Sequence, residues 1–317
     1  MEEFVAKPCT TDLYYLGECC RWDDVRQELY WIDVTTGRFF RAKADATRVD
    51  VVRTYDVGGH LTALAPFDPR SDGWIVASDQ SISLLDEAGT LHEVARLEAS
   101  NAREVRTNDG AADPWGRFWI GTMAYEKTPG RGSLYRYHGS TSAELMFGDV
   151  AISNGLAWSP DRRTMYYVDS GPGTIHTFDV DQDGEISNKQ LFVKFDVERE
   201  GAPDGVCVDV NGGVWVAVWG GYEVRAYAPS GEQFARVKVA TVQPTCCAIG
   251  GANGTTLYVT TAQEDLEQAT LEAEPDAGRL FCADVHVAGL ALECYRPPVR
   301  EQDWEDDLAQ FPPTDWT

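Results

Sequence analysis

FWIGTM, at residues 118–123, combines aromatic, β-branched and small residues in a short run that is typical of a buried strand. Five further runs of this kind occur, and consecutive runs start 43 to 49 residues apart. They are LYWIDV (29–34), WIVASD (74–79), MYYVDS (165–170), VWVAVW (214–219) and LYVTTA (257–262). Most of the six follow a cluster of Pro, Gly, Asn and Asp, as in DPWGR, which favours a tight turn. The chain is therefore built from a repeated unit of short strands.

A repeat of about 45 residues with several short strands is typical of a propeller blade, which buries its faces only against neighbouring blades. Six such units account for residues 13–297 almost completely. We therefore predict an all-β fold: a six-bladed β-propeller with four-stranded antiparallel blades around a central channel. Because an open ring would leave an exposed sheet edge, we expect residues 3–8 to pair near the strands of 279–297.

Three segments are assigned by their relation to this ring. The propeller domain is predicted to cover residues 1–300, and the acidic stretch 301–317 forms a tail outside it. The helix-like stretch 262–274 is interpreted as a surface excursion between two strands. DVDQDGEI (179–186) imitates the start of an EF-hand calcium loop, but Gln190 stands where that loop needs a glutamate. We interpret it as a hairpin turn.

Charge and composition limit the partners of the chain. A net charge of −24 over 317 residues repels nucleic acid and anionic membranes, although it would also suit a high-salt environment. No stretch approaches 18 apolar residues, and the acidic start does not resemble a signal peptide. We therefore expect a cytoplasmic protein without membrane or nucleic-acid partners, either a monomer or a weak homo-oligomer. Eight cysteines without CxxC or zinc-finger spacing predict buried free thiols.

Four polar residues lie 10 or 11 positions before four of the β-type runs: Glu18, Asn108, Asn154 and Asp204. Equivalent residues of different blades lie at equivalent heights around the axis, so these side chains should converge near one mouth of the channel. Two carboxylates and two amides held together favour a bound cation, and oxygen donors suit hard or borderline divalent ions. The alternative is that Asn and Asp before Gly are ordinary turn residues.

Five stretches carry a family resemblance. They are GECCRW (17–22), RTNDGAADPWGRFWIGTM (106–123), ISNGLAWSPDRRTMYYVDS (152–170), PDGVCVDVNGGVWVAVWGG (203–221) and TLYVTTA (256–262). In these stretches the chain resembles the family of regucalcin (senescence marker protein), gluconolactonase and luciferin-regenerating enzyme. The resemblance covers roughly residues 13–297 and implies a six-bladed propeller with one catalytic divalent metal ion in the channel. It implies that the metal ligands are Glu18, Asn154 and Asp204, and that Arg106 and Asn108 hold the oxygens of the substrate.

The chain departs from the family at three places. Members usually have Gly or Ser and then Pro after the ligand glutamate, where this chain has Cys19 and Cys20. We expect both thiols to be packing residues, and a sulfur ligand or a vicinal disulfide is the alternative. The insertion around 263–276 and the tail at 301–317 have no family counterpart.

The activity that the resemblance implies is hydrolysis of a sugar lactone, an aldonolactone of five or six carbons, to the sugar acid. The metal ion would act as Lewis acid and water activator, and Asp204 as general base. His60 and Glu126, which begins a loop rich in Gly and Pro, are further candidates for substrate binding, and Arg103 is a weaker one. Oxygen ligation admits calcium, zinc, magnesium, manganese and iron(II). A non-enzymatic calcium-binding propeller module and a hydrolase of a different lactone or ester are the alternatives.

Overall fold

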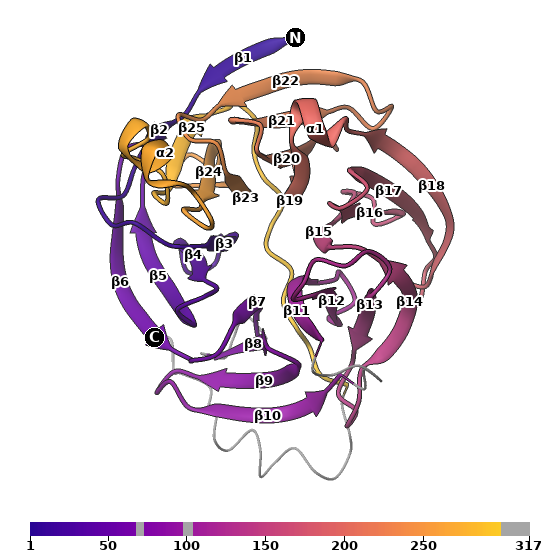
Figure 1. The fold of residues 1–317 in the computed structure, drawn as a ribbon. Coiled ribbons are helices and arrows are strands. Elements are labelled where there is room, and N and C mark those ends of the chain that lie inside the picture. Colours follow the sequence, from indigo (N-terminus) through magenta and orange to yellow (C-terminus); the bar gives the residue numbers. More distant parts are fainter. Residues whose placement is uncertain (68–72, 98–103, 299–317) are drawn as a thin grey trace.

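The fold is a ring of six β-sheets around a central channel (Figure 1). The computed structural model describes residues 1–67, 73–97 and 104–298, so the predicted tail at 301–317 lies outside the described residues. From residue 17 onwards each repeat of the sequence forms one sheet, and the chain passes around the ring one sheet at a time. The prediction of a six-bladed β-propeller is confirmed.

Blades 1 to 3 are built from consecutive antiparallel strands. Blade 1 contains β3 (Gly17–Asp23), β4 (Glu28–Asp33), β5 (Arg38–Ala44) and β6 (Val49–Asp56). Blade 2 contains β7 (Leu61–Pro66), β8 (Gly73–Ser78), β9 (Ser81–Asp86) and β10 (Leu91–Arg96). Blade 3 contains β11 (Val105–Ala112), β12 (Phe118–Ala124), β13 (Gly132–Tyr137) and β14 (Glu144–Val150).

Blades 4 to 6 complete the ring and recruit the N-terminal strands. Blade 4 contains β15 (Ser153–Trp158), β16 (Thr164–Asp169), β17 (Thr174–Val180) and β18 (Ile186–Lys194). Blade 5 contains β19 (Ala202–Val208), β20 (Val214–Trp219), β21 (Glu223–Tyr227), β22 (Gln233–Lys238) and β1 (Glu2–Val5). Blade 6 contains β23 (Pro244–Gly250), β24 (Thr256–Thr261), β25 (Phe281–Asp284) and β2 (Lys7–Pro8).

The expected ring closure is confirmed for one N-terminal strand and wrong for the other. β2 pairs with β25, through Lys7 with Cys282 and Pro8 with Phe281, and so supplies the fourth strand of blade 6. β1 instead continues past blade 6 and pairs in parallel with β22 of blade 5. It covers the outer edge of that sheet, which would otherwise expose unpaired backbone groups.

Tryptophans in the second strands anchor the cores of the blades. Four of them are almost completely buried: Trp31, Trp74, Trp119 and Trp215. In blades 3 and 5 the indole N–H donates to an aspartate of the preceding turn, from Trp119 Nε1 to Asp113 Oδ2 at 2.7 Å and from Trp215 Nε1 to Asp209 Oδ2 at 2.8 Å. The same carboxylates accept backbone N–H groups of their turns. The turn aspartate therefore ties each of these hairpins to the core beneath it.

The first strand of every blade faces the channel (Figure 1). These inner strands, β3, β7, β11, β15, β19 and β23, pack against one another around the ring. In each of them the pairing with the second strand shifts register in its first half. Such irregularities bend a strand and change the direction of its side chains. All of the predicted channel residues lie in or beside them.

After β25 the chain crosses the middle of the ring (Figure 1). Gly289 bridges Asp209 of blade 5, and Tyr295 N–H donates to Pro66 O of blade 2 at 2.8 Å. Arg296 N–H donates to a backbone carbonyl of blade 3. The crossing segment, residues 285–298, therefore links blades that are not neighbours.

Helices contribute little to the described part of the chain. α1 (Val197–Glu200) precedes β19, and α2 (Gln268–Ala273) lies in the excursion between β24 and β25, as expected for 262–274. The interpretation of DVDQDGEI as a hairpin turn is confirmed, because it connects β17 and β18. Among the described residues, no helix has the length and apolar character needed to cross a membrane.

Candidate active site

Hydrogen bonds connect the predicted amides across neighbouring inner strands. Asn108 Nδ2 on β11 donates to Asn154 Oδ1 at 3.3 Å and to Ser153 O at 2.9 Å, both on β15. Asn154 Nδ2 donates to Ser170 Oγ at 2.8 Å, and Ser170 Oγ donates to Pro203 O, next to Asp204 on β19, at 2.6 Å. The alternative of ordinary turn residues is wrong for all three positions, because each lies inside a strand.

The glycines after Asn154 and Asp204 allow the inner strands to approach each other. A Cβ at Gly155 would lie 2.7 Å from Asp204 O and 2.9 Å from Val206 N. A Cβ at Gly205 would lie 2.7 Å from the Cα of Cys246 on β23. The Asn-Gly and Asp-Gly pairs thus serve close blade packing at the level of the site.

The two predicted carboxylates repel each other in a desolvated place. Asp204 is 5% exposed, and its Oδ1 has no hydrogen-bond partner among the described residues. Burial raises the pKa of Asp204 well above its ordinary value, and the charges of Glu18 and Asp109 raise it further. Desolvation and the charge of Asp109 raise the pKa of Glu18 to about 8. Each of these groups would be stabilised as an anion by a cation placed among them.

A buried ion pair that was not predicted from the sequence lies beside the site. Arg21, on β3, lies 3.8 Å from Asp109 Oδ1 on β11, and its guanidinium also donates to Gly110 O at 3.1 Å and to Cys20 O at 2.9 Å. Asp109 Oδ2 is buried and has no partner in the described part of the chain. Asp109 directly follows Asn108, and an Arg three positions after Glu18 is the signal that would have pointed to a channel charge.

The predicted substrate clamp is assembled as a unit. Arg106 Nη1 donates to Asn108 Oδ1 at 2.9 Å and to Thr107 O at 2.8 Å. Desolvation lowers the pKa of Arg106, and the surrounding acids oppose that shift. Since the amide N–H groups of Asn108 are directed to β15, Asn108 orients Asn154, and Arg106 keeps other N–H groups for a ligand.

The outer candidates lie at the rim of the channel. The ring of His60 contacts that of Tyr125, with centroids 5.9 Å apart, and His60 Nδ1 lies 3.1 Å from Asp79 Oδ1. Glu126 is exposed on the loop after β12. Neither is joined to the inner carboxylates by a contact in the described residues. Arg103 lies outside the described residues.

The thiols pack rather than point at a ligand. Cys19 Sγ lies 3.7 Å from Leu64 O of blade 2, and Cys20 Sγ lies 3.8 Å from Tyr258 O of blade 6. Cys19 has φ 52°, a left-handed conformation that favours glycine, and its N–H donates to Glu18 Oε2 at 3.0 Å. All eight cysteines are free, as predicted.

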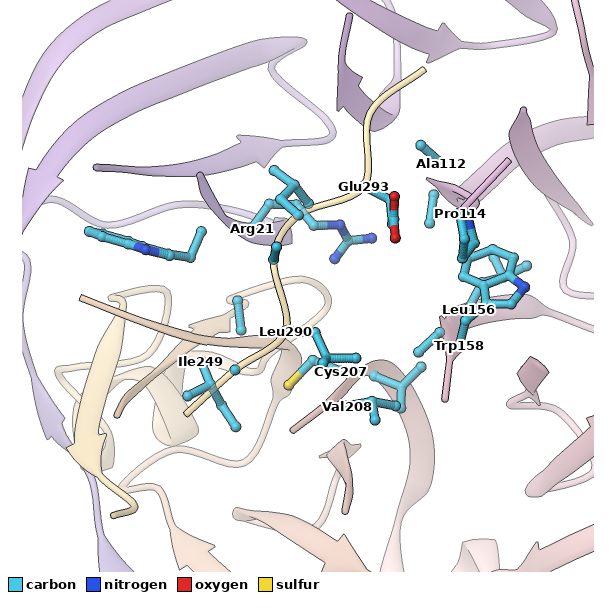
Figure 2. A pocket seen from close by; sticks show the side chains of 18 of the residues that line it. Arg21, Ala112, Pro114, Leu156, Trp158, Cys207, Val208, Ile249, Leu290 and Glu293 are labelled. Atoms are coloured by element: carbon cyan, nitrogen blue, oxygen red, sulfur yellow. The ribbon is translucent and has the colours of Figure 1, made fainter. Parts of the chain in front are cut away.

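A separate cavity of about 250 Å³ lies behind Arg21 (Figure 2). Its walls are mainly apolar and include Leu156, Val208 and Leu290, and Figure 2 shows the side chains of Arg21 and Glu293 directed into it. The predicted metal ligands do not line it. Arg21 therefore lines this cavity and also lies 3.8 Å from the carboxylate of Asp109.

The donor set at the mouth fits a cation only if an amide contributes. In the ranges that the structure describes, three or more His, Cys, Asp or Glu side chains nowhere converge closely enough to hold a metal. Glu18 and Asp204 supply carboxylates, and Asn154 supplies an amide oxygen whose contact with Asn108 is long. A cation site without its ion is expected to show carboxylate oxygens that lack a partner and acids that repel each other, as Asp204 does here.

Comparisons with known proteins agree on one family. The model of the SMP-30/Gluconolactonase/LRE-like region matches residues 16–263. A 6-deoxy-6-sulfogluconolactonase from Pseudomonas putida is 35% identical over 277 residues, covering 87% of this chain and 93% of the relative. Regucalcin from Gallus gallus is 33% identical over 298 residues, covering 90% and 95%. The crystal structure of a calcium-binding protein, regucalcin, from Agrobacterium tumefaciens superimposes with a TM-score of 0.84 at 28% identity, covering 93% and 99%.

Proposed function

Because this chain belongs to the SMP-30/gluconolactonase/LRE-like family, we propose that it hydrolyses an aldonolactone of five or six carbons with one divalent cation in the channel. The family, together with relatives named for that activity, shows that the chain is a lactonase acting on a small-molecule sugar lactone. The proposed cation is supported by the buried, unpartnered Oδ1 of Asp204 beside the charge of Glu18.

Glu18, Asn154 and Asp204 are the residues that would hold the cation. Their donors are all oxygens, which suits calcium, magnesium, manganese, iron(II) or zinc. When bound, the cation would polarise the lactone carbonyl and lower the pKa of a water molecule. Support for a divalent ion also comes from the structural neighbour described as a calcium-binding protein.

The protein side chains then have distinct tasks. Asp204 accepts the proton of the attacking water through a carboxylate oxygen, as general base. Asn108 holds the amide of Asn154 in place through its Nδ2. Arg106, fixed by Asn108 Oδ1, donates hydrogen bonds to the hydroxyl groups of the sugar. His60 and Glu126, at the rim, contact the part of the sugar that lies away from the carbonyl.

Metal removal tests this proposal directly. We expect the chelated and dialysed protein to lose lactone hydrolysis by more than about 100-fold and to regain it with one of the five ions, measured as acid release from gluconolactone, xylonolactone and arabinolactone. Hydrolysis at an undiminished rate after exhaustive stripping contradicts the metal-dependent mechanism.

The Asp204→Asn variant should remain folded and lose turnover of the same lactones by about 100- to 1,000-fold.

The same assay separates the alternatives. A protein that binds calcium by calorimetry but releases acid from none of the lactones would be a non-enzymatic calcium-binding module. Release from aryl lactones or phosphate esters alone would identify a hydrolase of a different ester. Arg106, whose guanidinium has further N–H groups beyond those bound to Asn108 and Thr107, favours the sugar lactone, because a purely structural ion needs no donors for substrate hydroxyls.

A further inference from the structure

The excursion between β24 and β25 brings an acid to the channel mouth that the predicted site does not contain. Glu264 belongs to blade 6, three blades away from the strand that carries Arg106. Its side chain is 23% exposed and lies 4.0 Å from Lys127, which is on the loop after β12, the strand in which Met123 pairs with Arg106. Desolvation lowers the pKa of Arg106, and the charge of Glu264 opposes that shift. Its charge also reaches Glu18 and Asp204. The negative charge of Glu264 therefore affects both Arg106, the proposed substrate-binding residue, and the proposed metal ligands Glu18 and Asp204.

The backbone holds Glu264 firmly. Gln243 Nε2 donates to Glu264 O at 3.0 Å, and the N–H of the preceding residue, Gln263, donates to Tyr15 O at 2.8 Å. At the other end of the excursion Glu274 accepts hydrogen bonds from Tyr222 Oη and Val242 N–H, each at 2.8 Å. Both ends of the excursion are thus tied to neighbouring blades, which fixes the backbone at Glu264.

A lysine from the opposite side of the ring meets this excursion. Lys127, on the loop after β12, places its Nζ 4.0 Å from Glu264 Oε2 and 3.9 Å from Asp265 Oδ2. Lys127 and Asp265 both have positive φ, 53° and 56°, so each stands at a tight turn. Loops of blades 3 and 6 therefore approach each other over the mouth, with Glu264 on the inner side of Asp265, whose side chain is 78% exposed.

We infer that Glu264 determines specificity by selecting uncharged sugar lactones against lactones that carry a carboxylate, phosphate or sulfonate. The inference rests on the proposed lactonase function. Arg106 alone would attract an anionic substituent as readily as a hydroxyl group. Glu264 offsets that charge in a channel of low dielectric constant, so the guanidinium still donates hydrogen bonds to hydroxyls but does not favour an anion.

Two lactones that differ only in charge test the inference. The γ-lactones of D-gluconic acid and D-glucaric acid share a ring and carbon skeleton, but the second carries a carboxylate in place of a hydroxymethyl group. We expect wild-type protein, with its metal ion, to prefer the uncharged lactone. Glu264→Gln should raise the ratio of kcat/KM for the anionic lactone to kcat/KM for the uncharged lactone about fivefold. The gain should shrink in about 0.5 M NaCl, because salt screens the charge.

Matched variants separate a local effect from a change in net charge. Asp265→Asn removes one negative charge from the exposed neighbour and should change the selectivity less than about twofold. Lys127→Met removes the cation that partly neutralises Glu264 and should lower kcat/KM for the anionic lactone about two- to threefold. This second variant keeps the inference testable if Glu264→Gln does not fold.

The outcomes are distinguishable. If wild-type protein hydrolyses neither lactone, the proposed function fails and this inference fails with it. If it hydrolyses the uncharged lactone and neither Glu264→Gln nor Lys127→Met changes the ratio of the two kcat/KM values, the proposed function stands and the role of Glu264 is overturned. An equal effect of Asp265→Asn would also overturn it, because the effect would then belong to net charge.

Discussion

At the scale of single residues, the buried acids of the channel are partly compensated by a buried guanidinium. The guanidinium of Arg21 lies 3.8 Å from Asp109 and also donates to two backbone carbonyls, so it reduces the cost of holding an acid next to Glu18 and Asp204. Without Arg21, the acids of the site would lose the positive group that lies next to Asp109. We therefore consider Arg21 a positioning residue for the acids rather than a group that meets the substrate.

This balance predicts non-additive effects on stability. Arg21→Met should lower the free energy of unfolding of the metal-free protein by about 3 kcal/mol, because it leaves Asp109 buried and uncompensated. Asp109→Asn in the same background should restore at least about 1 kcal/mol. Chemical denaturation of both single variants and the double variant measures the coupling. A double variant whose loss equals the sum of the single losses would show that the pair does not interact.

Some of these residues were predictable from the sequence and others were not, for a physical reason. Glu18, Asn108, Asn154 and Asp204 keep a constant distance from the β-type runs, so repetition alone placed them at one height of the channel. The ion pair of Asp109 and Arg21 could not be predicted, because it forms only when β3 and β11, which are not neighbours in the ring, face each other. Glu264 lies in an excursion that occurs in one blade only, so no repeat could assign it a position.

At the scale of elements, each blade was predictable through its second strand. The six apolar runs correspond to β4, β8, β12, β16, β20 and β24, because these strands are buried on both faces and their composition is correspondingly distinctive. The inner strands were less evident, since their register shifts interrupt the alternation that marks a strand. Some of the turns before the second strands contribute to stability, because their aspartates accept hydrogen bonds from tryptophans of the core.

Two aspartates in turns of similar appearance should therefore differ in importance. Asp113 is fully buried and accepts hydrogen bonds from Trp119 Nε1, Arg117 Nε and two backbone N–H groups. Asp113→Ala should lower the free energy of unfolding by about 3 to 4 kcal/mol, because it leaves these donors unpaired. Asp181→Ala, in the exposed hairpin of blade 4, removes two backbone contacts in water and should cost about 1 kcal/mol or less. Equal losses in thermal denaturation would contradict this ranking.

At the scale of the whole molecule, the N-terminal segment closes the ring at two places. β1 protects the edge of blade 5, with Glu3 paired to Arg236 and Lys238 at the surface. β2 completes blade 6, and Cys9 joins that blade to blade 1, since Cys9 N–H donates to Leu280 O at 2.8 Å and Cys9 O accepts from Val49 N–H at 2.9 Å. The prediction of closure by both chain ends rested on the cost of an open edge. The parallel pairing of β1 was not predictable, because the open edge of blade 5 gives no signal in the sequence of residues 2–5.

Two truncations distinguish these closures. A chain that begins at residue 6 loses only β1, whose side chains are mostly exposed, and should unfold with a melting temperature a few degrees lower. A chain that begins at residue 10 also loses β2 and the link through Cys9, so the edge of β25 and the seam between blades 6 and 1 are opened together. That protein should aggregate on mild heating and lose more than twice as much stability, measured by calorimetry and light scattering. If the two truncations behaved alike, the ring would be held by contacts between inner strands, and the strand that completes blade 6 would be dispensable.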